Sequence, residues 1–350
     1  MAIEEQYKAY QQKKYKKIIA VFLLVVLAAC SCLTLGTDLS LVEGLIASLN
    51  FAIGNPLTGE SITAQKVLIY LRLPRICIAI LSGMGLAIAG MMMQSVTRNF
   101  LVSPFTLGVS SAAAFGASMC IVFGNATIFF NDFLIIGSAF AMAVLGMLVI
   151  YIVTKSVGIT ANSVILVGIA LNYFFAALTA SLQFFAQENK LAAVVQWSFG
   201  TFNRANWHAV MVIGVVVIAC LILSRRLLLQ WDVIASGNDE LVKSLGINPE
   251  KLRSKTMLLA VLLTATIISF TGVIGFVGLI APHIARFTVG NEHNFLFPMT
   301  AAVGAILLVL ADTLGKYILY PVNVPVGIVV SFIGVPIFIH LIISTRRGGV

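Results

Sequence analysis

Charged residues are scarce in this chain. Asp, Glu, Lys and Arg make up 10% of its 350 residues, whereas 60% are hydrophobic; soluble domains carry about 25% charged residues. No soluble fold of this size buries so much apolar surface, so the composition predicts an all-α protein that crosses a membrane several times. The formal net charge of +9 is explained by Lys and Arg in cytoplasmic loops, and a nucleic acid partner is not expected.

Cysteine is also rare. The five cysteines are odd in number, and Cys77, Cys120 and Cys220 lie singly in apolar runs, so neither a disulfide framework nor a metal site is indicated. One alternative concerns Cys30, because "LAAC" after a basic segment resembles a lipoprotein signal. The apolar run continues past Cys30 to about Leu35, which favours a first transmembrane helix instead.

Two further absences narrow the function. No Gly-Lys-Ser or Gly-Lys-Thr occurs anywhere, so the chain has no Walker A motif and is not expected to be an enzyme by that route. Asp312 is the only acidic residue inside a predicted span, near its outer end. An ion-gradient-driven transporter would need ion-binding polar groups near the membrane midplane, and a membrane-embedded enzyme would need paired His, Asp or Glu residues. Both remain alternatives without support from a motif.

Apolar runs long enough to cross about 30 Å of hydrocarbon recur along the chain. Ten are predicted, at 18–36, 72–93, 106–123, 133–154, 163–185, 208–229, 256–275, 276–289, 297–315 and 325–344. With the N-terminus inside, most of the 22 Lys and Arg residues fall in inside loops. This bias predicts both termini on the cytoplasmic side. The expected organisation is a cytoplasmic tail over 1–17 and a single ten-helix domain over 18–347.

Small residues form a stripe within the second run. In "SGMGLAIAG" (82–90), one helical face carries Ser82, Gly83, Leu86, Ala87 and Gly90. Close helix packing is the expected cause, because packing drives helix association in lipid. A phosphate-binding loop is not indicated, since no strand precedes these glycines.

A polar segment at 234–255 interrupts the apolar sequence. Asn238 can cap a helix whose first turn holds Asp239 and Glu240, where negative charge is favourable. The same helix would have an apolar face, including Leu241 and Leu245, and would end at Gly246; Asn248 and Pro249 would then start the next helix. The pattern predicts two short helices with a tight turn on the cytoplasmic side. A docking element is favoured over a simple connecting loop.

Four stretches resemble the FecCD-type permeases of ABC importers, the membrane subunits for iron–siderophore, heme and vitamin B12 uptake. They are "LRLPRICIAILSGMGLAIAGMMMQSVTRNFLVSPFTLGVSSAAAFGA" (71–117), "LGINPEKLR" (245–253), and "TGVIGFVGLIAPHIARFTVGNEHNFLFPMTAAVGAILLVLADTLGKYI" (271–318) with "VPVGIVVSFIGVPIFIHLI" (324–342). The resemblance implies a ten-helix subunit of a bacterial or archaeal cytoplasmic membrane. It also implies a homodimer around a central pathway, two cytoplasmic ATPase subunits and an extracytoplasmic binding protein.

The resemblance assigns the cofactors and the cargo as well. ATP and Mg would be bound by the partner ATPase, and no cofactor is expected in this chain. The cargo would be a ferric siderophore, heme or cobalamin. The segment 234–255 would provide the coupling helices, in which Asp239, Glu240, Leu241, Leu245, Gly246 and Pro249 would contact or position the ATPase.

The resemblance further implies sites at the two membrane faces. Arg72, Arg75 and Lys316 would pair with acidic residues of the binding protein, although interfacial snorkelling also explains such residues. The cytoplasmic gate would include Asn99, Leu101, Ala161 and Asn162. Here the sequence departs from the family's usual "RNPL", because Phe100 replaces the proline. An ordinary connector, with Asn99 capping a turn, is the alternative.

His283 follows Pro282 in "APHIAR". A histidine within a span can serve as a proton relay or a heme ligand. The resemblance implies a structural role instead, and the other three histidines show no metal-ligand spacing.

Overall fold

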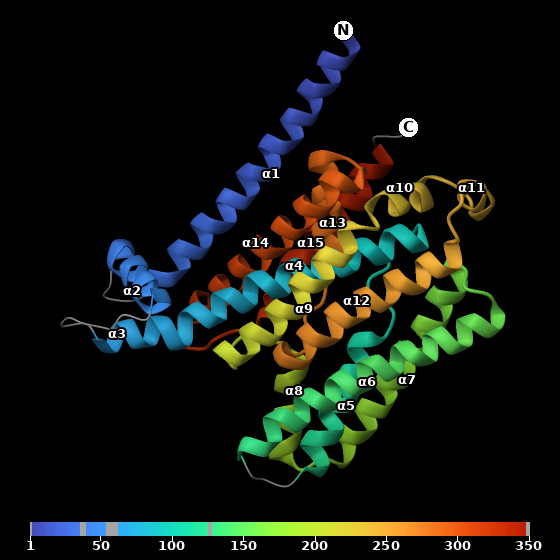
Figure 1. The fold of residues 1–350 in the computed structure, drawn as a ribbon. Helices are drawn as coiled ribbons and strands as arrows, with labels where there is room; N and C mark the ends of the chain where they lie inside the picture. Colours follow the sequence, from blue (N-terminus) through green and yellow to red (C-terminus); the bar gives the residue numbers. More distant parts are fainter. Residues whose placement is uncertain (1, 36–39, 54–61, 125–127, 348–350) are drawn as a thin grey trace.

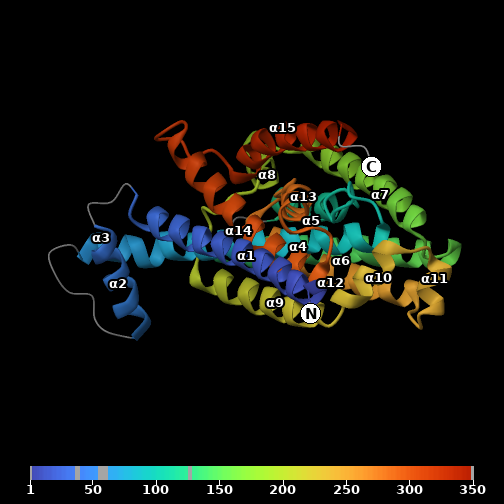
Figure 2. The same cartoon turned by 90° about the horizontal axis from the view of Figure 1, so that it is seen from above.

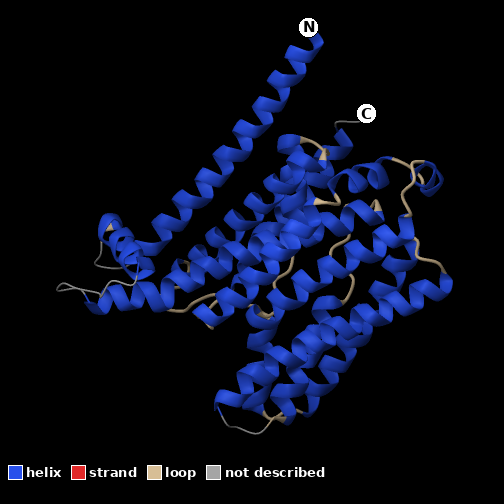
Figure 3. Cartoon of the chain, viewed as in Figure 1, coloured by secondary structure: helices blue, strands red, loops and turns tan. Residues whose placement is uncertain are grey.

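The chain folds as a bundle of helices. The computed structural model describes residues 2–35, 40–53, 62–124 and 128–347. Figure 3 shows that these segments are almost entirely helical, and an isolated bridge between Leu319 and Val322 is the only β-pairing found within them. The helices are α1 (Ala2–Thr34), α2 (Leu41–Ile53), α3 (Ile62–Val67), the π-helical turn η1 (Leu68–Arg72), α4 (Leu73–Thr97), α5 (Val109–Phe123), α6 (Ile128–Val157), α7 (Ala161–Phe185), α8 (Glu188–Ser198), α9 (Trp207–Arg225), α10 (Leu228–Ser236), α11 (Asp239–Ser244), α12 (Pro249–Thr271), α13 (Val277–Val289), α14 (His293–Tyr317) and α15 (Val326–Arg347).

Each of the ten predicted apolar runs coincides with a helix. Among the described residues, seven helices are long and apolar enough to cross a membrane: Glu4–Leu33, Ile62–Thr97, Asp132–Ser156, Ala161–Phe185, Trp207–Arg225, Pro249–Thr271 and His293–Tyr317. The other three runs correspond to the shorter apolar helices Val109–Phe123, Val277–Val289 and Val326–His340. The protein is therefore a multi-pass membrane protein, and the count of ten spans stays a prediction.

Helix α4 runs through the middle of the bundle in both views (Figures 1 and 2), and it packs against α12, α13 and α14. A Cβ added to Gly83 would lie 2.2 Å from the carbonyl oxygen of Gly304 in α14. A Cβ on Gly90 would lie 1.8 Å from the carbonyl oxygen of Gly278 in α13. Only glycine permits backbones to approach this closely, so the packing role predicted for the small-residue stripe is confirmed.

Several elements were not predicted. The helix that contains the first run begins at Ala2, so residues 2–17 are helical and continuous with that run. Helices α2, α3, α8 and α10 were also missed. Before α4, the turn η1 has the wider π register, closed by a bond from the Leu73 N–H to the Leu68 carbonyl. Pro74 explains the change of register, because it has no N–H to donate and its ring crowds the preceding turn.

The segment at 234–255 differs from its prediction. Its first residues end α10, and α11 forms the one short helix between Asp239 and Ser244. The predicted second short helix is instead the beginning of α12, which continues to Thr271. Helix α11 lies at the end of the bundle opposite α2 and α3 (Figures 1 and 2).

Candidate functional site

The caps of α11 and α12 are as the sequence predicts. The side chain of Asn238 accepts a hydrogen bond from the Leu241 N–H at 2.9 Å, and that of Asn248 accepts one from the Lys251 N–H at 3.0 Å. Gly246 adopts φ +80°, a left-handed conformation that glycine adopts without a Cβ clash. These caps and the left-handed glycine fix the orientation of the short helix α11 between α10 and α12.

Two leucines on and next to helix α11 are exposed to solvent. Val242 is fully buried beneath the helix, whereas Leu241 and Leu245 are 50% and 59% exposed. Glu240 is exposed beside them. An exposed apolar pair on a short, well-capped helix is suited to contact with another protein.

Asp239 attaches this helix to the bundle. Its Oδ1 accepts hydrogen bonds from Arg98 Nη2 and from Arg253 Nη2, both at 2.8 Å, and its Oδ2 accepts one from Arg253 Nη1 at 2.8 Å. The hydrogen bonds and charge of Arg253, followed by those of Arg98, lower the pKa of Asp239 from 3.8 to about 2. We call Arg98, Asp239 and Arg253 the inner cluster. The sequence indicated a first-turn acid at this position but did not indicate its partners.

Most of the predicted gate residues line one cavity. Asn99, Leu101 and Asn162 border a space of about 790 Å³ at the α11 end of α4. Ala161 does not line it; it is the first residue of α7, behind a capping box made by Thr160 and Ser163. The Asn99 side chain accepts a hydrogen bond from the Leu101 N–H at 2.9 Å, so Asn99 caps a turn, and the choice between gate and ordinary connector stays a prediction.

Phe100, the residue that departs from the family pattern, is held against α13. Its carbonyl oxygen accepts hydrogen bonds from Gln94 Nε2 at 2.9 Å and lies 3.2 Å from His283 Nε2. The Arg286 guanidinium lies 4.5 Å from the centre of its ring, within range of a cation–π interaction. His283 thus has a structural contact, and no group of three metal-binding side chains occurs within the described ranges.

The three predicted docking residues gather at the opposite end of α4. Arg75 binds both oxygens of Asp312, with Nε–Oδ2 at 2.9 Å and Nη2–Oδ1 at 2.7 Å, and Lys316 Nζ lies 2.9 Å from Asp312 Oδ2. Arg72 donates to the carbonyl oxygens of Leu33 and Leu35 at the end of α1. We call Arg72, Arg75, Asp312 and Lys316 the outer cluster.

The outer cluster has a net positive charge and an opening. Its three basic residues line a common cavity of about 610 Å³. The cluster contains three cations and one carboxylate, so an additional acidic group would be attracted to the cavity. The docking role of these residues stays a prediction, and Arg75 already has an internal carboxylate partner.

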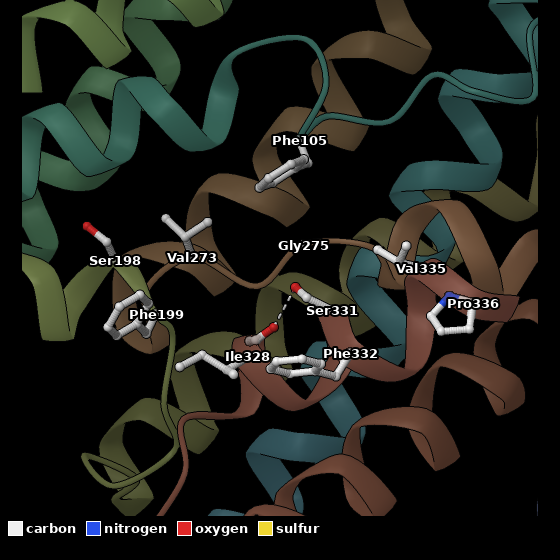
Figure 4. Close-up of a pocket in the computed structure, with 11 residues that line it drawn as sticks. Phe105, Ser198, Phe199, Val273, Gly275, Ile328, Ser331, Phe332, Val335 and Pro336 are labelled. Atoms are coloured by element: carbon white, nitrogen blue, oxygen red, sulfur yellow. Dashed lines mark hydrogen bonds between the residues drawn. The ribbon is translucent and has the colours of Figure 1, made fainter. Parts of the chain in front are cut away.

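The residues that line a third cavity are all uncharged. It has a volume of about 600 Å³, and its walls come from α8, α15 and the segments near Phe105 and Gly275. Figure 4 shows the rings of Phe105 and Phe332 on either side of Gly275, and Ser331 donating its hydroxyl to the Gly327 carbonyl at 2.8 Å. Such a wall offers few hydrogen bonds to a polar solute.

One polar group was missed entirely. Ser95 Oγ lies 2.6 Å from His293 Nε2, and His293 Nδ1 lies 2.6 Å from Asp232 Oδ1. The Ser95 hydroxyl also donates to the Met91 carbonyl within α4, and the Ser95 and His293 side chains are buried. This chain of hydrogen bonds ties α4 to α10 and α14. No local signal reveals it, because the three residues are far apart in the sequence.

Comparison with known proteins agrees with this architecture. The sequence pattern of the FecCD transport family matches residues 22–344. A Methanocaldococcus jannaschii protein described as an ABC transporter permease (MJ0087) is 40% identical, over 99% of both chains. The iron(3+)-hydroxamate import permease FhuG of Bacillus subtilis is 36% identical, over 81% of this chain and 85% of its own. A solved structure, described as an inward-facing metal-chelate type ABC transporter, superposes with a TM-score of 0.82 at 29% identity, over 94% of this chain and 99% of the other.

Proposed function

The chain belongs to the FecCD transport family, and from this premise we propose that it is the permease subunit of an ABC importer for an iron(III) chelate. A ferric siderophore is the favoured cargo, because the relative from Bacillus subtilis is named for ferric hydroxamate import. Heme and cobalamin are the alternatives. The active form would be a homodimer in the cytoplasmic membrane, with both termini on the cytoplasmic side.

The observation that carries this proposal is the exposed leucine pair of α11. Leu241 and Leu245 project from a capped turn in a chain that has no Walker A motif. An ATPase subunit with an apolar groove would cover them. ATP and Mg would bind to that subunit, and its hydrolysis cycle would shift the permease between outward-facing and inward-facing states by acting on α11.

The outer cluster supports a second partner. The cavity lined by Arg72, Arg75 and Lys316 would receive acidic side chains of a substrate-binding protein. The uncharged cavity around Phe105 and Phe332 would belong to the pathway between the two copies. The gate residues Asn99, Leu101, Ala161 and Asn162 would then close its cytoplasmic end.

An ion-gradient-driven transporter is the competing function. Such a protein needs a carboxylate or other polar group in the span that an ion can occupy. Asp312 is the acidic residue that the sequence places within a span, and its carboxylate is already paired with Arg75 and Lys316. The structure therefore favours the ATP-driven alternative.

The decisive experiment uses liposomes loaded with the chain alone or with its ATPase and binding protein. We expect uptake of radiolabelled ferric hydroxamate only from the complete complex with internal ATP. Concentrative uptake by the chain alone, under a proton or sodium gradient, would contradict the proposal.

A matched pair of variants tests the docking of the ATPase. The double variant Leu241→Asp and Leu245→Asp should lose the ATPase in a pull-down. Leu319→Asp should retain it, because Leu319 is as exposed as Leu245 but lies after α14, away from α11.

A further inference from the structure

We propose that Arg253 links α11 mechanically to the two loops of the inner gate, so that a displacement of α11 moves both loops. The proposal rests on the proposed function, in which α11 receives the ATPase. It concerns a residue that lies in the predicted coupling segment 234–255 but is not among the individual residues predicted for coupling or for the gate. Its basis is a single guanidinium group that contacts three separate segments.

The first contact is with α11. Arg253 binds both oxygens of Asp239 through Nη1 and Nη2, at 2.8 Å each. This two-point geometry fixes the direction of the carboxylate as well as its distance. The Arg253 side chain is 2% exposed, so water cannot readily replace Asp239.

The other two contacts are with the backbone beside the gate. Arg253 Nε donates to the Val96 carbonyl at 3.2 Å, three residues before Asn99. Arg253 Nη1 donates to the Ile159 carbonyl at 3.2 Å, two residues before Ala161. Because these bonds are already at the upper end of the normal range, a shift of about 1 Å in the guanidinium must move the backbone or break them.

Arg98 makes a second, parallel connection. It donates to Asp239 through Nη2 and to the Ile234 carbonyl through Nε at 2.6 Å. Its backbone has φ +50°, which is uncommon for a residue with a side chain and which its contacts must maintain. Arg98 immediately precedes Asn99, so the first gate loop begins at a residue that is bonded directly to α11.

A third set of contacts, made by Phe100, opposes movement of the gate loop. Phe100 is held on α13 by His283 and Arg286, and Gln94 of α4 donates to the same carbonyl oxygen. The gate loop therefore lies between a movable attachment at α11 and a fixed attachment at α13. A displacement of α11 would stretch the loop against the Phe100 contacts until they open.

Fold stability alone does not require an arginine at this position. Buried ion pairs are often replaced by apolar residues at little cost to stability. Transmission, however, needs a planar group that reaches three segments at once. Lysine cannot provide it, because its side chain ends in a single nitrogen instead of the forked guanidinium.

The test uses Arg253→Lys in the complete complex in liposomes. We expect the ATPase to remain bound, and ferric hydroxamate uptake to fall roughly tenfold. Lys66→Met, which removes an exposed cation from α3 at the other end of the bundle, should leave uptake unchanged.

Spin labels on a cysteine-free background separate transmission from folding. One label at Ser244 reports α11, and a label at Asn162 in both copies reports the gate. In the wild type, both label distances should change when ATP is added. In Arg253→Lys, the α11 distance should change while the gate distance stays constant.

Three outcomes would contradict either the proposed function or the link through Arg253, and the two label distances distinguish them. If neither distance responds to ATP in the wild type, the proposed function fails. If both still respond in Arg253→Lys, or uptake is unchanged, the link through Arg253 is refuted. If neither responds in the variant, Arg253 only positions α11 for docking, and the link is likewise refuted.

Discussion

The two ends of α4 carry charged clusters in opposite arrangements, with one aspartate and three basic residues in the outer cluster and one aspartate and two basic residues in the inner cluster. In each cluster, two basic side chains hold one aspartate. In the outer cluster the carboxylate of Asp312 is 5% exposed, and its partners Arg75 and Lys316 are 14% and 26% exposed. In the inner cluster Asp239 is 36% exposed, and Arg253 is 2% exposed. The most buried member is the anion Asp312 at one end and the cation Arg253 at the other, where the second cation, Arg98, is 29% exposed.

This inversion indicates different tasks. A buried carboxylate beneath more exposed cations presents positive charge at the surface, which suits a partner with acidic groups. A buried cation that reaches an exposed carboxylate anchors a surface element to the interior. The same kinds of residue therefore make a charged surface at one end and an attachment point at the other.

The largest difference between the clusters should appear in stability. Asp239→Ala leaves Arg253 buried without a carboxylate, and we expect a loss of about 3 kcal/mol in unfolding free energy. Asp312→Ala should cost less, because Arg75 and Lys316 can extend toward water. Thermal unfolding of the purified chain in detergent measures both, and an equal or reversed order would contradict the comparison.

A smaller effect is expected for docking at the outer cluster. Lys316→Gln removes one partly buried cation but leaves Asp312 paired with Arg75, so the fold should be retained. Affinity for the binding protein should fall about fivefold at low salt, with less difference at high salt. Lys66→Gln serves as the control, since Lys66 is exposed but does not line the cavity. Equal losses for both variants would show that general charge, and not the cluster, attracts the partner.

The smallest expected effect is the pH dependence of the stability that Asp239 contributes in the inner cluster. The pKa of Asp239 is lowered from 3.8 to about 2 by Arg253 and Arg98. Because the folded state holds the carboxylate ionised, its contribution to stability is complete above pH 3.8 and is lost as the pH falls toward about 2. The difference in unfolding midpoint between wild type and Asp239→Asn should stay constant from about pH 7 to about pH 4, and shrink at about pH 3. A decline that begins near pH 6 would contradict the arrangement described.

Sequence patterns predicted the local features of both ends well. The caps at Asn238 and Asn248 and the left-handed Gly246 depend on neighbours a few residues away, so the sequence contains their full physical cause. The apolar runs located the helices for the same reason. The stripe of small residues predicted close packing, although not the helices against which α4 packs.

Features that depend on distant residues were not predictable in this way. Asp239 could be placed in a first turn, but Arg98 lies 141 residues away and the sequence carries no sign of their pairing. Asp312 is likewise separated from Arg75 by 237 residues. The extent of α1 was missed because its first turns are polar, and η1 was missed because a π register has no marker beyond Pro74.

The glycine contacts of α4 limit what can move during transport. With Gly83 set against Gly304 and Gly90 set against Gly278, the backbones of α4, α14 and α13 are in direct contact at two levels, with no side chain between them. Helices α4, α13 and α14 should therefore travel as one rigid block throughout the cycle. The rearrangements that open and close the pathway must then be confined to the periphery of that block.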